Sequence, residues 1–184
     1  MEIVFVLLLA LALSFDTFAV AVSCGLYMPR ITFVNALKIS ISLAFFQAVL
    51  PLLGWLSGNT LKPYINQYDH WIAFILLVLL GSKMIWESTK MKQEKAFNPL
   101  NPLVILWLSV ATSLDALVVG FSIALVDVHL ALTVITIGGV TLLAAMTGIL
   151  IGKKASSVFG KKMEMAGGII LIAIAIKVLS SHLA

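Results

Sequence analysis

The sequence is poor in charged and metal-binding side chains. Only 11% of its 184 residues are Asp, Glu, Lys or Arg, and it has one cysteine and three histidines. A single cysteine excludes an intrachain disulfide and any metal site built from several cysteines. With 61% hydrophobic residues and a mean hydropathy of +1.13, the chain has too little polar surface to cover a water-soluble particle.

Motifs of catalytic and nucleotide-driven proteins are also missing. The sequence has no phosphate-binding Gly-rich loop with a lysine, no nucleophile beside a partnered base and no redox-cofactor motif. It therefore gives no support to an enzyme, to a bound cofactor or to ATP-driven pumping. The net charge of +4 does not indicate a nucleic-acid partner, because the basic residues stand between hydrophobic runs.

Apolar runs make up most of the chain. Each is close to the ~20 residues that a helix needs to cross a bilayer, and lipid leaves the backbone no alternative to helix. The six predicted spans are Ile3 to Cys24, Phe33 to Leu56, His70 to Trp86, Leu103 to Ala124, Leu130 to Ile151 and Ala166 to Leu179. The fold class predicted from these runs is an all-α membrane protein with six transmembrane helices.

Basic residues predict the orientation of these spans. They flank or fill the first, third and fifth connections, as Arg30, Lys38, Lys90, Lys92, Lys95, Lys153, Lys154, Lys161 and Lys162, whereas only Lys62 stands in a connection on the opposite face. By the positive-inside rule the odd connections are cytoplasmic and both termini are extracytoplasmic. The polar segment 90–102 is the predicted cytoplasmic linker between a first unit, 1–89, and a second unit, 103–184.

The two units are related by an internal repeat. Residues 12–26 align without a gap on residues 111–125, and later segments of each unit align as well. The alignment pairs Asp16 with Asp115, Ser14 with Ser113, Ser23 with Ser122, Gln47 with Thr141, Gly54 with Gly148, Gly58 with Gly152 and Lys83 with Lys177. Because each unit crosses the membrane three times, the copies run in opposite directions, as in inverted-repeat transporters that bind substrate near the midplane.

Only one pair of acidic residues, Asp16 and Asp115, lies well inside the predicted spans. An aspartate at mid-span costs roughly 2.5 to 3.5 kcal/mol, so each needs a compensating partner. We expect Lys83 and Lys177 to snorkel from the span ends, with Glu87 as an ion-pair partner for Lys83, and no basic residue to be deep enough for both aspartates. The partner is then a cation or protons, and two carboxylates carry one divalent ion or two protons. In the alternative, the aspartates are protonated and only hold helices together.

The other candidate ligands near this pair all offer oxygen. They are hydroxyl side chains close to the aspartates along the helices, together with an amide in the second span and its repeat-related hydroxyl: Ser14, Thr17, Ser23, Thr112, Ser113, Ser122, Gln47 and Thr141. An oxygen-only site suits magnesium, calcium or manganese better than copper or zinc. With Asp16 and Asp115 these eight residues form the predicted metal site.

Several short segments are more specific than composition: Ser14-Phe-Asp16, Pro51-Leu-Leu-Gly-Trp55, His70-Trp-Ile-Ala-Phe74, Gly81-Ser-Lys-Met-Ile85 and Ala111-Thr-Ser-Leu-Asp115. With them the chain resembles, over essentially its whole length, the bacterial manganese efflux pumps of the MntP type, which are related to the lysine exporter superfamily. The resemblance implies export of manganese across the bacterial cytoplasmic membrane, with Asp16 and Asp115 as essential acids. Gln47 is a departure, because some relatives have a glutamate there, and it leaves the ion stoichiometry open.

The leading hypothesis is a secondary transporter that exports Mn²⁺ by alternating access, with protons returning in exchange. The expected partners are the Mn²⁺ ion and the lipid bilayer, without nucleic acid, and the oligomeric state stays open. The superfamily suggests an exporter of amino acids or other small cations as the first alternative. A non-transporting membrane scaffold, in which the aspartates are structural, is the second.

Overall fold

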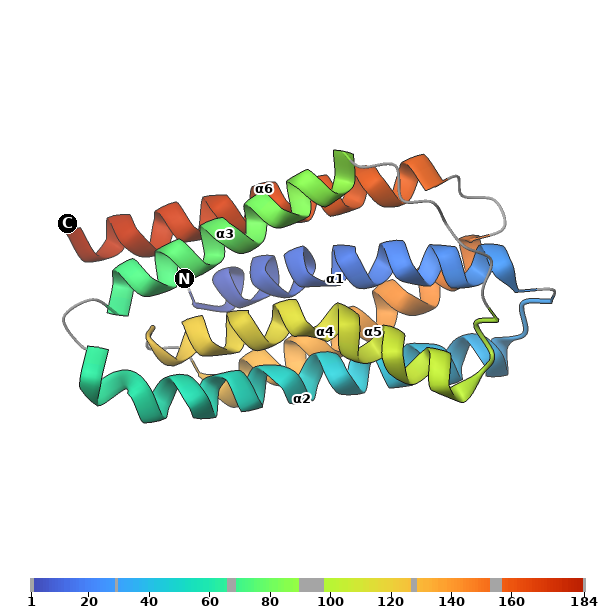
Figure 1. Ribbon diagram of the computed structural model, residues 1–184, viewed down its shortest axis with the longest axis horizontal. Helices are drawn as coiled ribbons and strands as arrows, with labels where there is room; N and C mark the ends of the chain where they lie inside the picture. The colour runs from blue at the N-terminus through green and yellow to red at the C-terminus, as the bar shows by residue number, and fades with distance from the viewer. Residues whose placement is uncertain are drawn as a thin grey trace.

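A computed structural model describes residues 2–28, 30–65, 69–89, 98–126, 129–152 and 157–183. Within these residues it contains six α-helices and no strand (Figure 1). The helices are α1 (Glu2–Tyr27), α2 (Phe33–Ile65), α3 (Asp69–Thr89), α4 (Pro102–Ala124), α5 (Leu130–Ile151) and α6 (Ser157–Leu183). The prediction of an all-helical chain is confirmed.

Five of the six described helices extend beyond the predicted apolar runs, and α2 and α6 do so most. The second span was expected to end at Leu56, but α2 continues to Ile65, and the sixth was expected to begin at Ala166, but α6 begins at Ser157. Hydrophobicity marks only the part of a helix that suits lipid, whereas intrahelical hydrogen bonds continue through polar residues. The fourth span was expected to begin at Leu103, and α4 begins one residue earlier, at Pro102, where Asn101 caps the helix by accepting a hydrogen bond from the Leu103 amide.

The outer surface of the bundle is suited to lipid. Among the residues that the structure describes, four stretches are long and apolar enough to span a bilayer: Ile3–Tyr27, Phe33–Thr60, Pro102–Ala124 and Leu130–Ile151. The apolar stretches found in α3 and α6 are shorter, although these helices have 21 and 27 residues and so reach ~30 Å at 1.5 Å per residue. Large apolar side chains such as Ile135 (73% exposed) and Leu143 (69%) point outward. The fold is that of an α-helical membrane protein.

The helices lie roughly along one axis and alternate in direction (Figure 1). At one end of the bundle α1, α3 and α5 begin, and α2, α4 and α6 end there. The pairs α3 with α6, α2 with α4, and α1 with α5 pack most extensively, while α1 also contacts α6. The major contacts therefore form a closed ring in the order α1, α5, α2, α4, α3, α6 and back to α1. The two helices that carry the aspartates, α1 and α4, each have one face toward their neighbours and one exposed apolar face, with Ile3 63% and Trp107 66% exposed.

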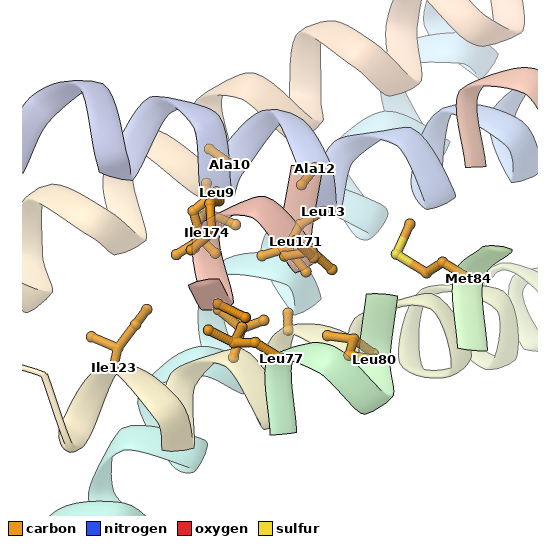
Figure 2. Packing of buried hydrophobic residues seen from close by; sticks show 14 residues of the cluster. Leu9, Ala10, Ala12, Leu13, Leu77, Leu80, Met84, Ile123, Leu171 and Ile174 are labelled. Atoms are coloured by element: carbon orange, nitrogen blue, oxygen red, sulfur yellow. The ribbon is translucent and has the colours of Figure 1, made fainter. Parts of the chain in front are cut away.

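Apolar side chains fill the space between α1, α3, α4 and α6. Figure 2 shows this cluster, in which side chains from α1 and α6 meet those of α3 and α4: Leu9, Leu13, Leu77, Leu80, Ile123, Leu171 and Ile174. A second cluster joins α1, α2 and α5 and includes Cys24, Met28, Ile39, Leu43 and Ile149. Polar side chains that lie between these helices are therefore surrounded by apolar side chains.

Glycines allow α2 and α4 to approach closely while running in the same direction (Figure 1). A Cβ atom on Gly54 would collide with the carbonyl oxygen of Leu117, and a Cβ atom on Gly58 would lie 2.8 Å from the carbonyl oxygen of Phe121. Since any side chain at these positions would meet backbone atoms, the two glycines fix the spacing of α2 and α4.

The contact between α1 and α5 uses equivalent positions. A Cβ atom on Gly148 would lie 3.0 Å from the Phe18 carbonyl oxygen, and one on Gly152 would lie 2.6 Å from that of Val22. Gly54 and Gly58 of α2, shifted by 94 residues, correspond to Gly148 and Gly152 at the end of α5. The contacted residues of α1, Phe18 and Val22, correspond after a shift of 99 residues to Leu117 and Phe121 of α4. The offset of 99 also aligns the two aspartates. Contacts in one half of the chain thus recur in the other half.

Candidate ion site

Asp115 lies near the middle of α4 and forms an ion pair with α3. The residue is only 8% exposed, and the Lys83 Nζ donates a hydrogen bond of 2.7 Å to its Oδ1. The lysine side chain is 49% exposed, whereas the Asp115 side chain is 11% exposed. The buried carboxylate of α4 is therefore neutralised by an ammonium group from the neighbouring α3.

This ion pair corrects the expectation that Lys83 snorkels away from the aspartates. A four-carbon stem reaches inward as easily as outward, and in a low-dielectric bundle the attraction of a nearby carboxylate outweighs snorkelling. Glu87, the partner proposed from the sequence, has a side chain outside the described residues. The sequence feature that pointed to a role for Lys83 other than snorkelling was the internal repeat, which places Lys83 and Lys177 at equivalent positions within the predicted spans.

A second polar contact links α4 to α2. The Ser113 hydroxyl donates a hydrogen bond of 2.9 Å to Gln47 Oε1, and both residues are at most 1% exposed. Along the same interface the hydroxyl groups of Ser42 and Ser109 are 2.9 Å apart. The Gln47 Nε2 atom is buried and has no hydrogen-bond partner among the described residues.

The predicted ligands on α4 are divided between two faces. Ser113 and Asp115 are two residues apart, which turns their side chains about 200° from each other around the helix, so Ser113 faces α2 while Asp115 faces α3. Ser122 is seven residues after Asp115 and shares its face. The hydroxyls of Ser122 and Thr112 donate to carbonyl oxygens one turn earlier, at 3.0 and 2.9 Å.

The predicted ligands on α1 and α5 are also buried or half-buried. Thr17 and Thr141 are fully buried, and their hydroxyl oxygens have no hydrogen-bond partner among the described residues. Ser14 is buried and donates a hydrogen bond of 2.8 Å to an earlier carbonyl of its own helix. Asp16 and Ser23 are partly buried.

Three buried polar atoms thus lack partners in the described part of the chain, and all belong to the predicted ligand set: Thr17 Oγ1, Gln47 Nε2 and Thr141 Oγ1. An unsatisfied buried polar atom costs about 1 to 3 kcal/mol. The two hydroxyl oxygens are suitable ligands for a hard cation. Rotating the Gln47 amide by 180° would let Nε2 donate to Ser113 and place a carbonyl oxygen at the unsatisfied position.

The described residues hold no cluster of three or more His, Cys, Asp or Glu side chains. A metal bound among them would depend on one or two carboxylates and on neutral oxygens. That ligand set fits hard cations such as Mg²⁺, Ca²⁺ and Mn²⁺, and it does not fit a zinc or copper site, which uses imidazole or thiolate.

A small apolar cavity lies along the Asp115 face of α4. Its volume is about 10 Å³, roughly the space that one water molecule needs. The lining residues come from α1, α3, α4 and the residues directly after α4: Phe5, Leu9, Leu77, Val119, Ser122, Ile123 and Val126. Ser122 is the only one of the predicted ligands in this lining.

Comparisons with known proteins identify relatives along the whole chain. Residues 30–179 match a protein family described as "Putative manganese efflux pump". A protein of Crocosphaera subtropica with that description and the name MntP is 44% identical over 184 residues, which cover 100% of this chain and 98% of the relative. Identically named proteins of Syntrophotalea carbinolica and Photorhabdus laumondii are 42% and 41% identical, over 95% and 96% of this chain and 94% and 93% of theirs. No solved structure matches.

The matches agree with the resemblance seen in the sequence, and they span nearly the full length of both partners. The helical bundle with its lipid-suited surface adds independent support for a multi-pass bacterial membrane protein. The chain therefore belongs to the MntP family.

Proposed function

We propose that this chain exports Mn²⁺ from the bacterial cytoplasm as a secondary transporter. The observation that carries the proposal is the buried carboxylate of Asp115 near the middle of α4, together with unsatisfied buried side-chain atoms that all belong to residues of the predicted ligand set. An acid at this depth is costly and usually functional. The names of the relatives, which describe manganese efflux pumps, give the substrate of the proposal.

Alternating access between two inverted three-helix units is part of the proposal. Its support is the recurrence of the α2–α4 contacts in α1–α5, with offsets of 94 and 99 that match the sequence repeat. In such transporters the units rock against each other around a site near the midplane. The distribution of Lys and Arg favours extracytoplasmic termini, so that cytoplasmic Mn²⁺ enters where α2, α4 and α6 begin.

In the proposed site Asp16 and Asp115 supply the charge and the neutral oxygens complete the coordination. Mn²⁺ balances the two carboxylates while it is bound. When it is released, the Lys83 ammonium group compensates Asp115 and a returning proton would compensate the remaining carboxylate, so exchange of Mn²⁺ for protons keeps the charge of the site balanced. Each mid-span aspartate costs roughly 2.5 to 3.5 kcal/mol, and cation binding offsets this cost. Thr17, Thr141 and Gln47 are the neutral ligands that we favour, because the two unsatisfied hydroxyl oxygens would gain a partner, and so would the Gln47 carbonyl oxygen once its amide is rotated by 180°.

The test uses a bacterial host that lacks its own manganese exporter. The parent chain should lower cellular manganese and restore growth at high manganese, while Asp16→Asn and Asp115→Asn should do neither at matched membrane levels. Glu94→Gln is the matched control, because it removes one carboxylate from the polar segment between the two units and should export like the parent.

Three outcomes would contradict the proposal in different ways. If the parent leaves manganese unchanged but lowers the cellular level of an amino acid or another small cation, the substrate is wrong. If the parent changes no solute, the chain is a scaffold. If both Asp→Asn variants export as well as the parent, the aspartates are structural and the ion site lies elsewhere.

A further inference from the structure

The ion pair between α3 and α4 joins two groups of very different exposure. The side chain of Asp115 is 11% exposed. The side chain of Lys83 is 49% exposed, and its ammonium group sits at the end of a stem with four rotatable carbons. The lysine side chain therefore has more room to change its rotamer than the enclosed aspartate.

A divalent cation and an ammonium group compete for the same carboxylate oxygen. The Lys83 Nζ lies 2.7 Å from Asp115 Oδ1, the distance of a charge-assisted hydrogen bond. Hard divalent cations bind carboxylate oxygens at about 2.0 to 2.6 Å. A cation on this oxygen would stand within a few ångströms of the ammonium group, and like charges at that separation in a low-dielectric bundle repel strongly.

We propose that Lys83 is a tethered counter-ion that competes with the exported cation for Asp115, leaving when the cation binds and returning when it is released. This inference rests on the proposed export function and adds to it the residue that sets affinity and release. It also gives a reason for the position of Lys83, which lies far enough along α3 to reach the buried carboxylate of Asp115.

A transporter benefits from such a competitor in two ways. A site with two aspartates and no counter-ion would hold a divalent cation tightly and release it slowly. After release, Asp115 would be left as an uncompensated charge inside the bundle, which is strongly unfavourable. The returning ammonium group of Lys83 lowers the free energy of that cation-free state and so speeds release.

The experiment measures Mn²⁺ binding and efflux with the purified full-length chain. Binding is followed by the electron paramagnetic resonance signal of free Mn²⁺ during titration with MnCl₂, and efflux by the loss of radioactive manganese from loaded proteoliposomes. Lys83→Met removes the charge, and Lys83→Gln removes it but keeps a hydrogen-bond donor. Lys83→Arg keeps the charge, and Lys38→Met is the control, because Lys38 is an exposed lysine of α2.

Both neutral variants should bind Mn²⁺ about tenfold more tightly than the parent, in the usual range of coupling between interacting sites, and should release it several-fold more slowly at saturating manganese. Lys83→Arg and Lys38→Met should resemble the parent. Folded neutral variants with unchanged affinity and efflux would show that Lys83 is not a competitor. If neither neutral variant folds while Lys83→Arg does, the lysine is a structural counter-ion and the inference is wrong. If the parent neither binds nor exports Mn²⁺, the proposed function fails first.

Discussion

The contact between Gly120 and Pro51 sets the distance between α4 and α2, so Gly120→Ala should separate these helices. A Cβ atom on Gly120 would lie 2.5 Å from the Pro51 Cα and 2.7 Å from its carbonyl carbon, and it would collide with the carbonyl oxygen. Carbon atoms normally approach to about 3.5 Å. Because the obstacles are backbone atoms, relief requires the helices to move apart by about 1 Å.

The free-energy cost of the added methyl group at position 120 can be isolated with Gly139→Ala as the matched control. A Cβ atom on Gly139 would have no atom within 4 Å, so that variant gains only helix propensity, about 1 kcal/mol. Gly120→Ala gains the same propensity but adds an overpacked methyl group, which costs about 1 to 3 kcal/mol. Since propensity cancels between the two variants, Gly120→Ala should be less stable than Gly139→Ala by about 1 to 3 kcal/mol, and rigid backbone obstacles favour the upper end.

The separation of α2 and α4 should also change a contact within the candidate site. Ser113 and Gln47 are one to two turns from the Gly120 contact, and their hydrogen bond of 2.9 Å would lengthen to about 3.9 Å if the helices separated by 1 Å, beyond hydrogen-bonding range. Stability is measured by unfolding in mixed detergent micelles with circular dichroism, and export by cellular manganese. Equal stability of the two alanine variants would refute the reasoning, because it would show that α2 and α4 accommodate the methyl group without moving.

Two further predictions concern single hydroxyl groups. Ser113→Ala should lower the free energy of unfolding by about 1 to 3 kcal/mol, because it leaves the buried Gln47 amide wholly unsatisfied, whereas Ser57→Ala on the exposed surface of α2 should change it by less than about 0.5 kcal/mol. Thr141→Val should keep or raise stability, since it removes an unsatisfied buried hydroxyl at constant shape, yet it should weaken Mn²⁺ export if that oxygen is a ligand. The exposed Thr147→Val is its control, and unimpaired export by Thr141→Val would remove Thr141 from the site.

The helices and the burial of polar residues could be predicted from the sequence because both depend on local properties. Apolar runs of about 20 residues must form helices in lipid, and eight of the ten predicted ligands are buried in the structure, each at most 8% exposed. The division of Ser113 and Asp115 between two faces of α4 was also available from their spacing, since residues two apart on a helix point in nearly opposite directions. Grouping them by distance along the chain overlooked this geometry.

The partners of the buried groups could not be predicted in the same way. The contact of Lys83 with Asp115 joins residues that are 32 apart in the chain, and it depends on how α3 packs against α4. The sequence alone assigns a lysine near the end of a span to the membrane surface, because snorkelling is the commoner outcome when no carboxylate is near. Only the packing of the helices decides which outcome applies.

The repeat explains one further difference between the halves of the chain. Gln47 and Thr141 occupy equivalent positions, but the longer Gln47 side chain reaches Ser113, whereas Ser14, the equivalent of Ser113, bonds within α1 and Thr141 has no partner in the described residues. If the halves exchange conformations, as alternating access requires, the two states differ in their contacts, because the Gln47–Ser113 bond has no counterpart. A substitution at position 47 or 141 should therefore shift the balance between inward-facing and outward-facing states as well as alter the ligands of the ion.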